Sequence, residues 1–258
     1  MLLRAFRTAS LALLLFGCQE QRPETGDAVR MDADTTPTEA TVAAAYTGSE
    51  VCAGCHADQY QAWQRSHHDL ALQAATPDTV LARVTDPVDG TVFATGDRGI
   101  HISPEPGTVL VPRFTFGVAP LQQYVIDGGN GAWQTYPIAW DSRAVSSGGQ
   151  RWYNLNDAVY PPGDPMHWQG RANRWNSQCA DCHSTGVSKG YDPQTRSYHT
   201  TFEVEDVGCE ACHGPGSRHA ADPGTEGLLR LATQAEQIDA CAACHSRRGQ
   251  IAEGFRPD

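Results

Sequence analysis

The sequence predicts a mainly α-helical and irregular fold with an antiparallel β insertion in its first half. Three observations lead to this prediction. A five-residue pattern, Cys-x-x-Cys-His, occurs four times along the 258 residues. The last three copies begin 30 and 32 residues apart, which leaves room for one binding turn and one helix each. Residues 77–151, between the first and second copies, alternate in polarity and are interrupted by Gly, Pro, Asp and Asn, as in β hairpins.

The repeated pattern is the attachment site of a c-type haem. Two cysteines three apart lie on one side of a helical turn, so both thiols reach the vinyl groups on one porphyrin edge. The histidine that follows gives the iron an imidazole nitrogen. The predicted attachment cysteines are Cys52, Cys55, Cys179, Cys182, Cys209, Cys212, Cys241 and Cys244, and the predicted proximal ligands are His56, His183, His213 and His245.

Zinc binding and a disulfide framework are the alternative interpretations of paired cysteines in an exported protein. Against both, a histidine follows the second cysteine every time, the spacing never varies, and eight of the nine cysteines are used in this way. The sequence therefore predicts four covalently attached haems. Side chains can pack on these large, mostly apolar bodies, so a haem-packed domain needs little regular secondary structure.

Residues 1–18 predict an export signal. Arg4 and Arg7 precede a short apolar core, residues 11–16, which is too short to span a bilayer. The signal ends at Cys18 in a pattern similar to the lipobox of bacterial lipoproteins. A lone ninth cysteine at this point favours lipidation, which would anchor the chain without a transmembrane helix; a plain secretory signal is the alternative.

Residues 19–45 are rich in Thr, Glu, Asp, Pro and Ala and show no apolar period, which predicts a disordered tether. Residues 46–258 are then the cytochrome domain, with residues 77–151 as the β insertion. The insertion is expected to be a structural subdomain; the alternative is that it walls the haems on one side. Its candidate strands are residues 91–95, 99–102, 113–116, 121–126 and 133–140.

Six histidines remain as candidate distal ligands, and their use decides between an electron carrier and an enzyme. An iron with two imidazoles has no vacant position, whereas a five-coordinate iron can bind a small molecule. The six are His67, His68, His101, His167, His199 and His219.

Among these candidates His219 is favoured, because the glycines of residues 214–216 permit the tight reversal that brings a histidine back toward a haem. His68 comes next, at the end of a segment of helical composition beginning at Ala57; only one of two neighbouring histidines on a helix can face an iron. His167 is equally explained as a partly buried histidine, and Met166 is an alternative ligand. The other three are expected to be hydrogen-bonded or exposed to solvent.

The net charge of −11 and the single lysine, Lys189, exclude a typical nucleic-acid-binding protein. A generally acidic, soluble surface is the favoured interpretation of this charge, and docking on basic redox partner proteins is the alternative. Assembly with other cytochromes is a further possibility.

Four stretches resemble one known family. The pattern Trp63-x-x-Ser66-x-His68 is similar to the distal-ligand helix of the tetrahaem cytochrome c-554 family. The segment from Cys209 to His219 is similar to a site shared by that family and by octahaem hydroxylamine oxidoreductase and tetrathionate reductase relatives. Residues 116–124 and 175–185 resemble a branch of multihaem cytochromes whose longer members continue past this C-terminus.

The resemblance implies closely stacked haems, with His68 and His219 as distal ligands of haems other than the nearest one, and it leaves one haem open to five-coordination. The expected function is electron transfer by an exported, membrane-anchored tetrahaem cytochrome, a periplasmic or outer-membrane lipoprotein of a Gram-negative bacterium. The alternative is a multihaem oxidoreductase acting on a small nitrogen or sulfur species, although no Cys-x-x-Cys-Lys motif is present. A structural subunit of a cytochrome array is the third interpretation.

Overall fold

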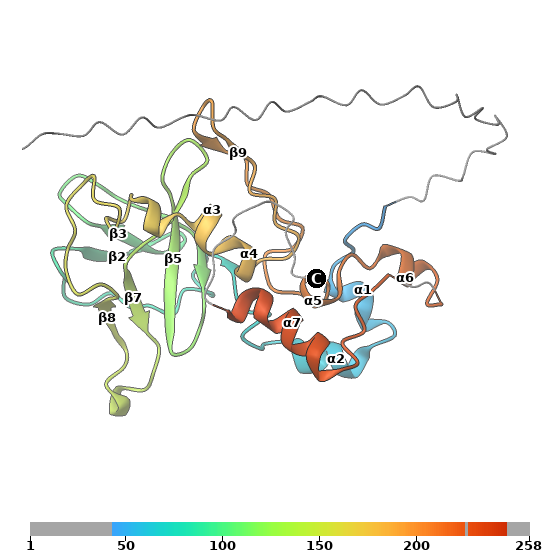
Figure 1. Cartoon of the computed structure of the whole chain (residues 1–258). Helices are drawn as coiled ribbons and strands as arrows, with labels where there is room; N and C mark the ends of the chain where they lie inside the picture. The colour runs from blue at the N-terminus through green and yellow to red at the C-terminus, as the bar shows by residue number, and fades with distance from the viewer. Residues whose placement is uncertain (1–42, 225–226, 247–258) are drawn as a thin grey trace, which may run out of the picture. The chain divides into compact units, whose positions relative to one another are not determined.

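The computed structural model describes residues 43–224 and 227–246. The predicted signal with Cys18, and residues 19–42 of the predicted tether, lie outside these residues. Within the described ranges, no helix has the length and apolar character needed to cross a membrane. Figure 1 shows the strands gathered on one side of this unit and most of the helices on the other.

The expectation of a mainly α-helical fold was wrong in its balance, because helices and strands contain similar numbers of residues. The helices are short, since each of the first six spans seven residues or fewer. They are α1 (Ser49–Ala53), α2 (Ala57–Trp63), α3 (Trp175–Gln178), α4 (Ala180–His183), α5 (Cys209–His213), α6 (Ser217–Ala221) and α7 (Gln234–His245), with 3-10 turns at Val145–Ser147 and Arg171–Asn173.

An antiparallel sheet between the first and second motifs is confirmed, and it extends past the predicted bounds of 77–151 at both ends. Its hydrogen-bonded order is β1-β4-β5-β7-β8, with β6 also paired to β5. The strands are β1 (Gln73–Ala74), β4 (Pro112–Phe116), β5 (Leu121–Asp127), β6 (Trp133–Thr135), β7 (Ile138–Asp141) and β8 (Arg151–Asn154). Two separate hairpins are formed by β2 (Val92–Gly96) with β3 (Gly99–Ser103), and by β9 (Tyr191–Asp192) with β10 (Ser197–Tyr198).

Strand β5 is covered on both faces, which is why the β part has two hydrophobic clusters. Successive side chains of a strand point to opposite faces. Tyr124 and Ile126 therefore join one cluster, which includes Trp140 and Trp152. Val125 joins the other cluster, together with Leu72, Phe114, Phe116, Trp133, Trp175 and Ala180.

Three sequence predictions of local structure need correction. Residues 133–140 form two strands rather than one, and β8 is an additional strand that the predicted candidate strands did not include. Helix α2 ends at Trp63, and Arg65 has a φ of 61°, so His67 and His68 lie in turns beyond the helix. The last helix, α7, begins at Gln234 and runs through the fourth motif.

Replacing Trp152 with alanine is expected to destabilise the β part by about 3–5 kcal/mol, the usual cost of truncating a fully buried aromatic side chain. Trp152 is 3% exposed, stacks on Phe93 at 3.8 Å, and its indole N–H donates to the Arg83 carbonyl at 3.0 Å. Chemical denaturation followed by near-ultraviolet circular dichroism measures the loss. The matched control is Tyr153→Ala on the same strand, whose side chain is only half-buried; an equal effect of both changes would contradict the prediction.

Candidate haem sites

All four motifs lie on or at the ends of short helices, as the reach of two thiols to one porphyrin edge requires. In the first, Cys52 is on α1 and His56 immediately precedes α2. The second begins just before α4, the third coincides with α5, and the fourth forms the last turn of α7. None of the eight motif cysteines is in a disulfide, and the described residues contain no cluster of three His, Cys, Asp or Glu side chains suited to a metal ion.

Two attachment sites lie next to each other. The thiols of Cys52 and Cys209 interact directly, and burial together with this neighbour raises the pKa of Cys52 to about 11. The backbone N–H of Cys209 donates to the Ser49 hydroxyl at 3.1 Å, which joins α5 to the first turn of α1. The first and third motifs, 157 residues apart in sequence, therefore share one local structure.

Two histidines from outside the motifs lie near motif histidines, and the ring centroids are almost equally far apart in the two pairs. The ring centroids of His56 and His219 are 6.3 Å apart, with an angle of 24° between the ring planes. Those of His68 and His245 are 6.2 Å apart, with an angle of 60°. Histidine–metal bonds are about 2 Å long, so two imidazoles on opposite sides of one metal ion have centroids about 6 Å apart. Both pairs have the ring separation that an iron between them would require.

The other two motif histidines are oriented by backbone carbonyls. Nδ1 of His183 donates to the Ala71 carbonyl at 3.1 Å, and Nδ1 of His213 donates to the Leu229 carbonyl at 2.6 Å. A hydrogen bond of this kind fixes the tautomer and leaves Nε2 as the metal-binding nitrogen. Burial lowers the pKa of His183, which favours the neutral imidazole that a metal needs. Sequence reasoning missed these carbonyls because a backbone acceptor depends on no residue type.

The position of His68 is set by Val207, in the segment between the β9–β10 hairpin and α5. The Trp63 indole N–H donates to the Val207 carbonyl at 3.0 Å, and the Val207 N–H donates to the His68 carbonyl at 3.1 Å. Trp63 also packs on Tyr60, with ring centroids 5.5 Å apart. The aromatic pair on α2 thus ties the turn that carries His68 to the segment leading into α5.

The remaining predicted candidates face other groups. His167 contacts the ring of Trp168 at 5.7 Å, and its Nδ1 accepts the Gln169 N–H at 3.3 Å. His101 pairs with Asp97 at 3.3 Å, and His199 with Ser197 at 3.3 Å. His67 is exposed. These placements bring none of the four opposite a motif histidine among the ring contacts of the described residues.

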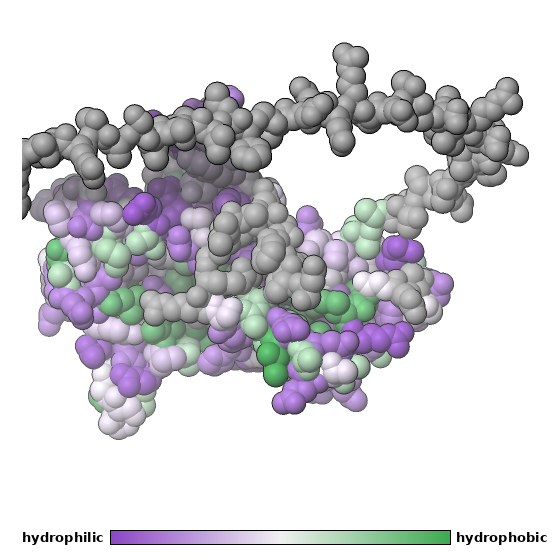
Figure 2. All heavy atoms as spheres, viewed as in Figure 1, coloured by the Kyte–Doolittle hydropathy of each residue, from purple (hydrophilic) through white to green (hydrophobic). Residues whose placement is uncertain are grey.

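The helical part fits large apolar cofactors because its own side chains form almost no core. Helices α2, α6 and α7 have no buried residue. Val51, Leu229 and Ile238, all in or near these helices, are 51%, 55% and 57% exposed. Figure 2 shows apolar surface among the helices in the right-hand half of the view. A domain this poor in buried apolar surface needs another source of stability, which bound haem would supply.

The second motif differs from the others because it packs against the β part. Cys179 contacts the cluster formed around Val125, and burial raises the pKa of its thiol to about 12. The ring of Phe116 lies edge-on to His183, with centroids 5.3 Å apart. The β insertion therefore does contact a haem site, through an aromatic side chain that no sequence motif singled out.

The side chain of Asp206, near the third motif, is half-buried. Burial, followed by the charges of Asp69, Glu50 and Glu205, raises the pKa of Asp206 to about 7, and its Oδ1 has no hydrogen-bond partner. An aspartate in the unfolded chain has a pKa near ~3.9. Between these two pKa values the Asp206 carboxyl is protonated in the folded chain and ionised in the unfolded chain. The stability that this group contributes is therefore fully present below about pH 4 and is lost as the pH rises through about 7.

Replacing Asp206 with asparagine is expected to flatten this pH dependence, because the amide carries no charge at any of these pH values. The check is the midpoint of thermal unfolding measured from pH 4 to pH 8 for both proteins. Glu203→Gln, which removes an exposed carboxylate three residues before Asp206, is the control. A wild-type midpoint that does not fall over this range would contradict the assignment.

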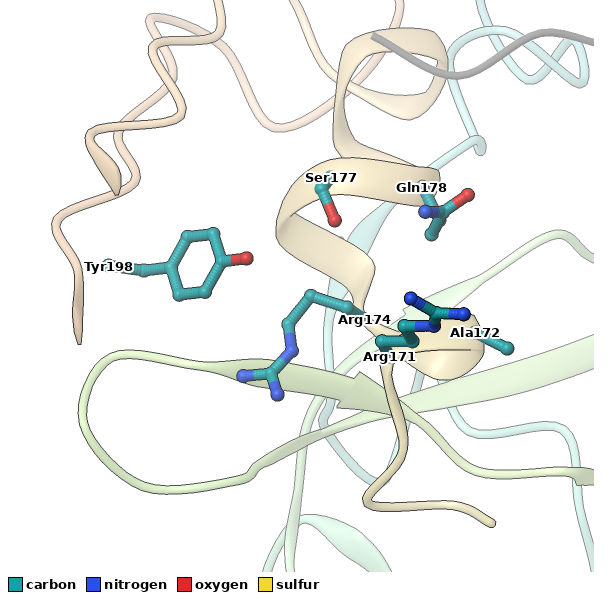
Figure 3. A pocket seen from close by; sticks show the side chains of 6 residues that line it. All are labelled: Arg171, Ala172, Arg174, Ser177, Gln178 and Tyr198. Carbon is teal, nitrogen blue, oxygen red and sulfur yellow. The ribbon is translucent and has the colours of Figure 1, made fainter. Parts of the chain in front are cut away.

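An open depression lies next to the second motif, on the residues just before Cys179. It has a volume of about 540 Å³ and is lined by Arg171, Ala172, Arg174, Ser177, Gln178 and Tyr198. Figure 3 shows the Arg174 side chain extended toward Tyr198, and its guanidinium lies 5.4 Å from the ring centroid. The depression is open and contains no motif cysteine or histidine, so it is not an attachment site.

Comparisons with known proteins agree with this chemistry. Residues 51–87 and 164–214 match the family described as cytochrome c554 and c-prime, and these segments contain the first three motifs. No curated protein matched the chain. One similar solved structure is the outer cell wall cytochrome OcwA, with 19% identity and a TM-score of 0.50 over 82% of this chain and 42% of that one.

A second is the undecahaem cytochrome from the S-layer of Carboxydothermus ferrireducens, with 22% identity and a TM-score of 0.48 over 79% of this chain and 26% of that one. The chain thus spans less than half the length of either protein. The likeness to OcwA supports a multihaem cytochrome fold with a mixed helix and strand content. The motifs and the matched segments together show a multihaem c-type cytochrome that is similar, over residues 51–87 and 164–214, to the cytochrome c554 and c-prime family.

Proposed function

We propose that this protein is an exported tetrahaem cytochrome that carries electrons between redox partner proteins. The observation that carries the proposal is the pair of facing histidines, each made of one motif histidine and one histidine from a distant segment. The site named haem 1 is formed by Cys52, Cys55 and His56 with His219. The site named haem 4 is formed by Cys241, Cys244 and His245 with His68.

The remaining attachment sites are haem 2, at Cys179, Cys182 and His183, and haem 3, at Cys209, Cys212 and His213. When bound, haem supplies one-electron redox chemistry. The chain holds each group by two thioethers and an imidazole. Carbonyl bonds to Nδ1 of His183 and His213 make those imidazoles more basic, which favours the ferric state and lowers the potential.

The contact between Cys52 and Cys209 supports electron transfer within the protein. Both thiols are attachment points, so haem 1 and haem 3 would be joined to neighbouring atoms of the chain. Two imidazoles on one iron leave no coordination position for a substrate. Haem 1 and haem 4 are therefore suited to passing electrons rather than to binding a small molecule.

Export and membrane anchoring are supported by the pattern of residues 1–18, with lipid on Cys18 as the anchor of a Gram-negative periplasmic or outer-membrane lipoprotein. The similar proteins are described as outer cell wall and S-layer cytochromes, which agrees with an exported chain. The net charge of −11 favours a basic protein as the docking partner and disfavours nucleic acid.

One observation favours a second candidate, an oxidoreductase acting on a small nitrogen or sulfur species. Within the described residues, no histidine ring contact opposes His183 or His213, and Phe116 is the ring beside His183. A haem with one protein ligand can bind a small molecule at its other face. Haem 2, packed against the β part, is the candidate site for that chemistry.

The test combines haem content with spin state in the purified, exported protein. Pyridine haemochrome is expected to give about four haems per chain, and electron paramagnetic resonance is expected to show low-spin ferric haem at two sites or more. Tight binding of nitrite, hydroxylamine or cyanide to a high-spin haem would favour the oxidoreductase. Bound zinc, or the absence of iron, would overturn both candidates.

A further inference from the structure

A buried carboxylate inside the third motif joins three segments that are distant in sequence. Glu210 is the residue after Cys209, and its side chain points away from solvent with only 3% of its surface exposed. Glutamate is rarely buried to this degree unless its charge is compensated by hydrogen bonds or a partner charge. No lysine or arginine lies within ion-pair distance of it in the described part of the chain. Its compensation comes from backbone and hydroxyl donors.

Three backbone N–H groups converge on the two carboxylate oxygens. The Thr47 N–H lies 3.0 Å from both oxygens, and the Gly48 N–H donates to Oε2 at 2.9 Å. From the other side, the Gly216 N–H donates to Oε1 at 2.7 Å. The Thr47 hydroxyl adds a fourth donor at 3.3 Å. Every partner is a donor, which matches an ionised, acceptor-only carboxylate.

Two of these donors, Gly48 and Gly216, stand at the starts of two different helices. Gly48 is the N-cap of α1, the helix that carries Cys52 and leads directly to His56. Gly216 is the N-cap of α6, the helix that contains His219. Glu210 therefore holds the starts of the two helices whose histidines face each other 6.3 Å apart. The adjacent bonds between Ala45 and Ser217, at 2.8 and 3.1 Å, hold the same two segments together.

We propose that Glu210 is the positioning residue of haem 1: it sets the separation and orientation of the His56 and His219 imidazoles from inside the attachment motif of haem 3. This inference rests on the proposed ligand pair of haem 1. The buried carboxylate also places a negative charge beside Cys52, which stabilises the ferric state of haem 1 and keeps its potential low.

Charged hydrogen bonds are the strong ones, and a neutral replacement cannot reproduce them all. Glutamine has the same shape, but its amide nitrogen cannot accept, so at least one buried N–H among Thr47, Gly48 and Gly216 loses its acceptor. Aspartate keeps the charge but is shorter by one methylene group. These two substitutions therefore separate the loss of charge from the loss of reach.

The experiment compares Glu210→Gln, Glu210→Asp and Gly216→Ala in the full holo-protein. A Cβ on Gly216 would lie 3.1 Å from Oε1 and would push the carboxylate without changing its charge. The readouts are haem content, the low-spin resonances and the potential of each haem. All three variants are expected to keep the wild-type haem content and to alter the resonance that His219→Ala abolishes, with the potential raised most in Glu210→Gln.

Glu205→Gln is the matched control, because it removes an exposed carboxylate five residues away. It is expected to leave that resonance and its potential unchanged. The proposal is overturned if Glu210→Gln and Gly216→Ala lower thermal stability while every resonance and potential stays as in the wild type. It is also overturned if Glu205→Gln has the same effect as Glu210→Gln.

If Glu210→Gln fails to assemble, Glu210→Asp and Gly216→Ala decide the question by the same resonance. Failure of the underlying ligand pair looks different. In that case His219→Ala would itself leave all low-spin resonances intact. If His219→Ala alters the spectrum while the Glu210 and Gly216 variants leave it unchanged, only the role of Glu210 is rejected.

Discussion

Replacing His219 with alanine is expected to convert one haem from low spin to high spin. The physical reason is that His219 faces His56 at 6.3 Å between ring centroids, and its loss would leave that iron with one protein ligand. About a quarter of the haem should change spin state, and its potential should rise by on the order of 0.1 V, since axial ligation sets haem potentials over ~0.8 V. Electron paramagnetic resonance and spectroelectrochemical titration measure both effects.

The haem content of this variant should stay the same, because the thioethers and His56 remain. His101→Ala is the matched control: this histidine is paired with Asp97 on the β2–β3 hairpin. It should leave the spectrum unchanged. The corresponding change at His68 should affect a different resonance, because His68 faces His245. A wild-type spectrum for His219→Ala would reject the assigned pair.

The double change Cys209→Ser and Cys212→Ser is expected to remove one haem from each chain. Serine has no thiol to form a thioether, and helix α5 offers no other covalent attachment. Pyridine haemochrome should fall by about a quarter, and intact mass should fall by one haem. The resonance of haem 1 should also shift, because Cys209 contacts Cys52 and Glu210 holds the helices on either side of haem 1.

Haem 4 provides an internal reference in this experiment, since its resonance should not move. Cys18→Ser is the external control, because it removes the only cysteine outside the motifs and should leave the haem content unchanged. Full haem content in the double serine variant would mean that the third motif does not bind haem.

The attachment motifs could be predicted from the sequence because the residues that attach one haem are close together in the chain. Both thiols and the proximal imidazole of each site come from five consecutive residues, so spacing alone predicts them. The strands of the β insertion were predicted for a similar reason, since alternation along a strand is read within a few residues. Strand β8 was missed because it has only four residues, too few to show a clear alternation, and it is defined by its pairing with β7.

The ends of helices were predicted less well because they depend on bonds to other segments. Helix α7 begins at Gln234 because Thr233 and Glu236 form reciprocal capping bonds of 3.2 and 2.8 Å. Helix α2 ends early, and the turn beyond it is tied to Val207 through the Trp63 indole and the His68 carbonyl. Composition alone placed the end of the segment that begins at Ala57 several residues beyond Trp63.

The sequence by itself determined the cofactor chemistry through four copies of one attachment motif. It also predicted an export signal on an acidic chain and a β insertion between the first two copies. Only the tertiary structure decided which distant side chains meet. His56 and His219 are 163 residues apart, and they face each other because Glu210 binds the helix starts on both sides. The physical reason is that ligands on one helical turn follow from spacing, whereas opposed ligands depend on how separate segments pack and share hydrogen bonds.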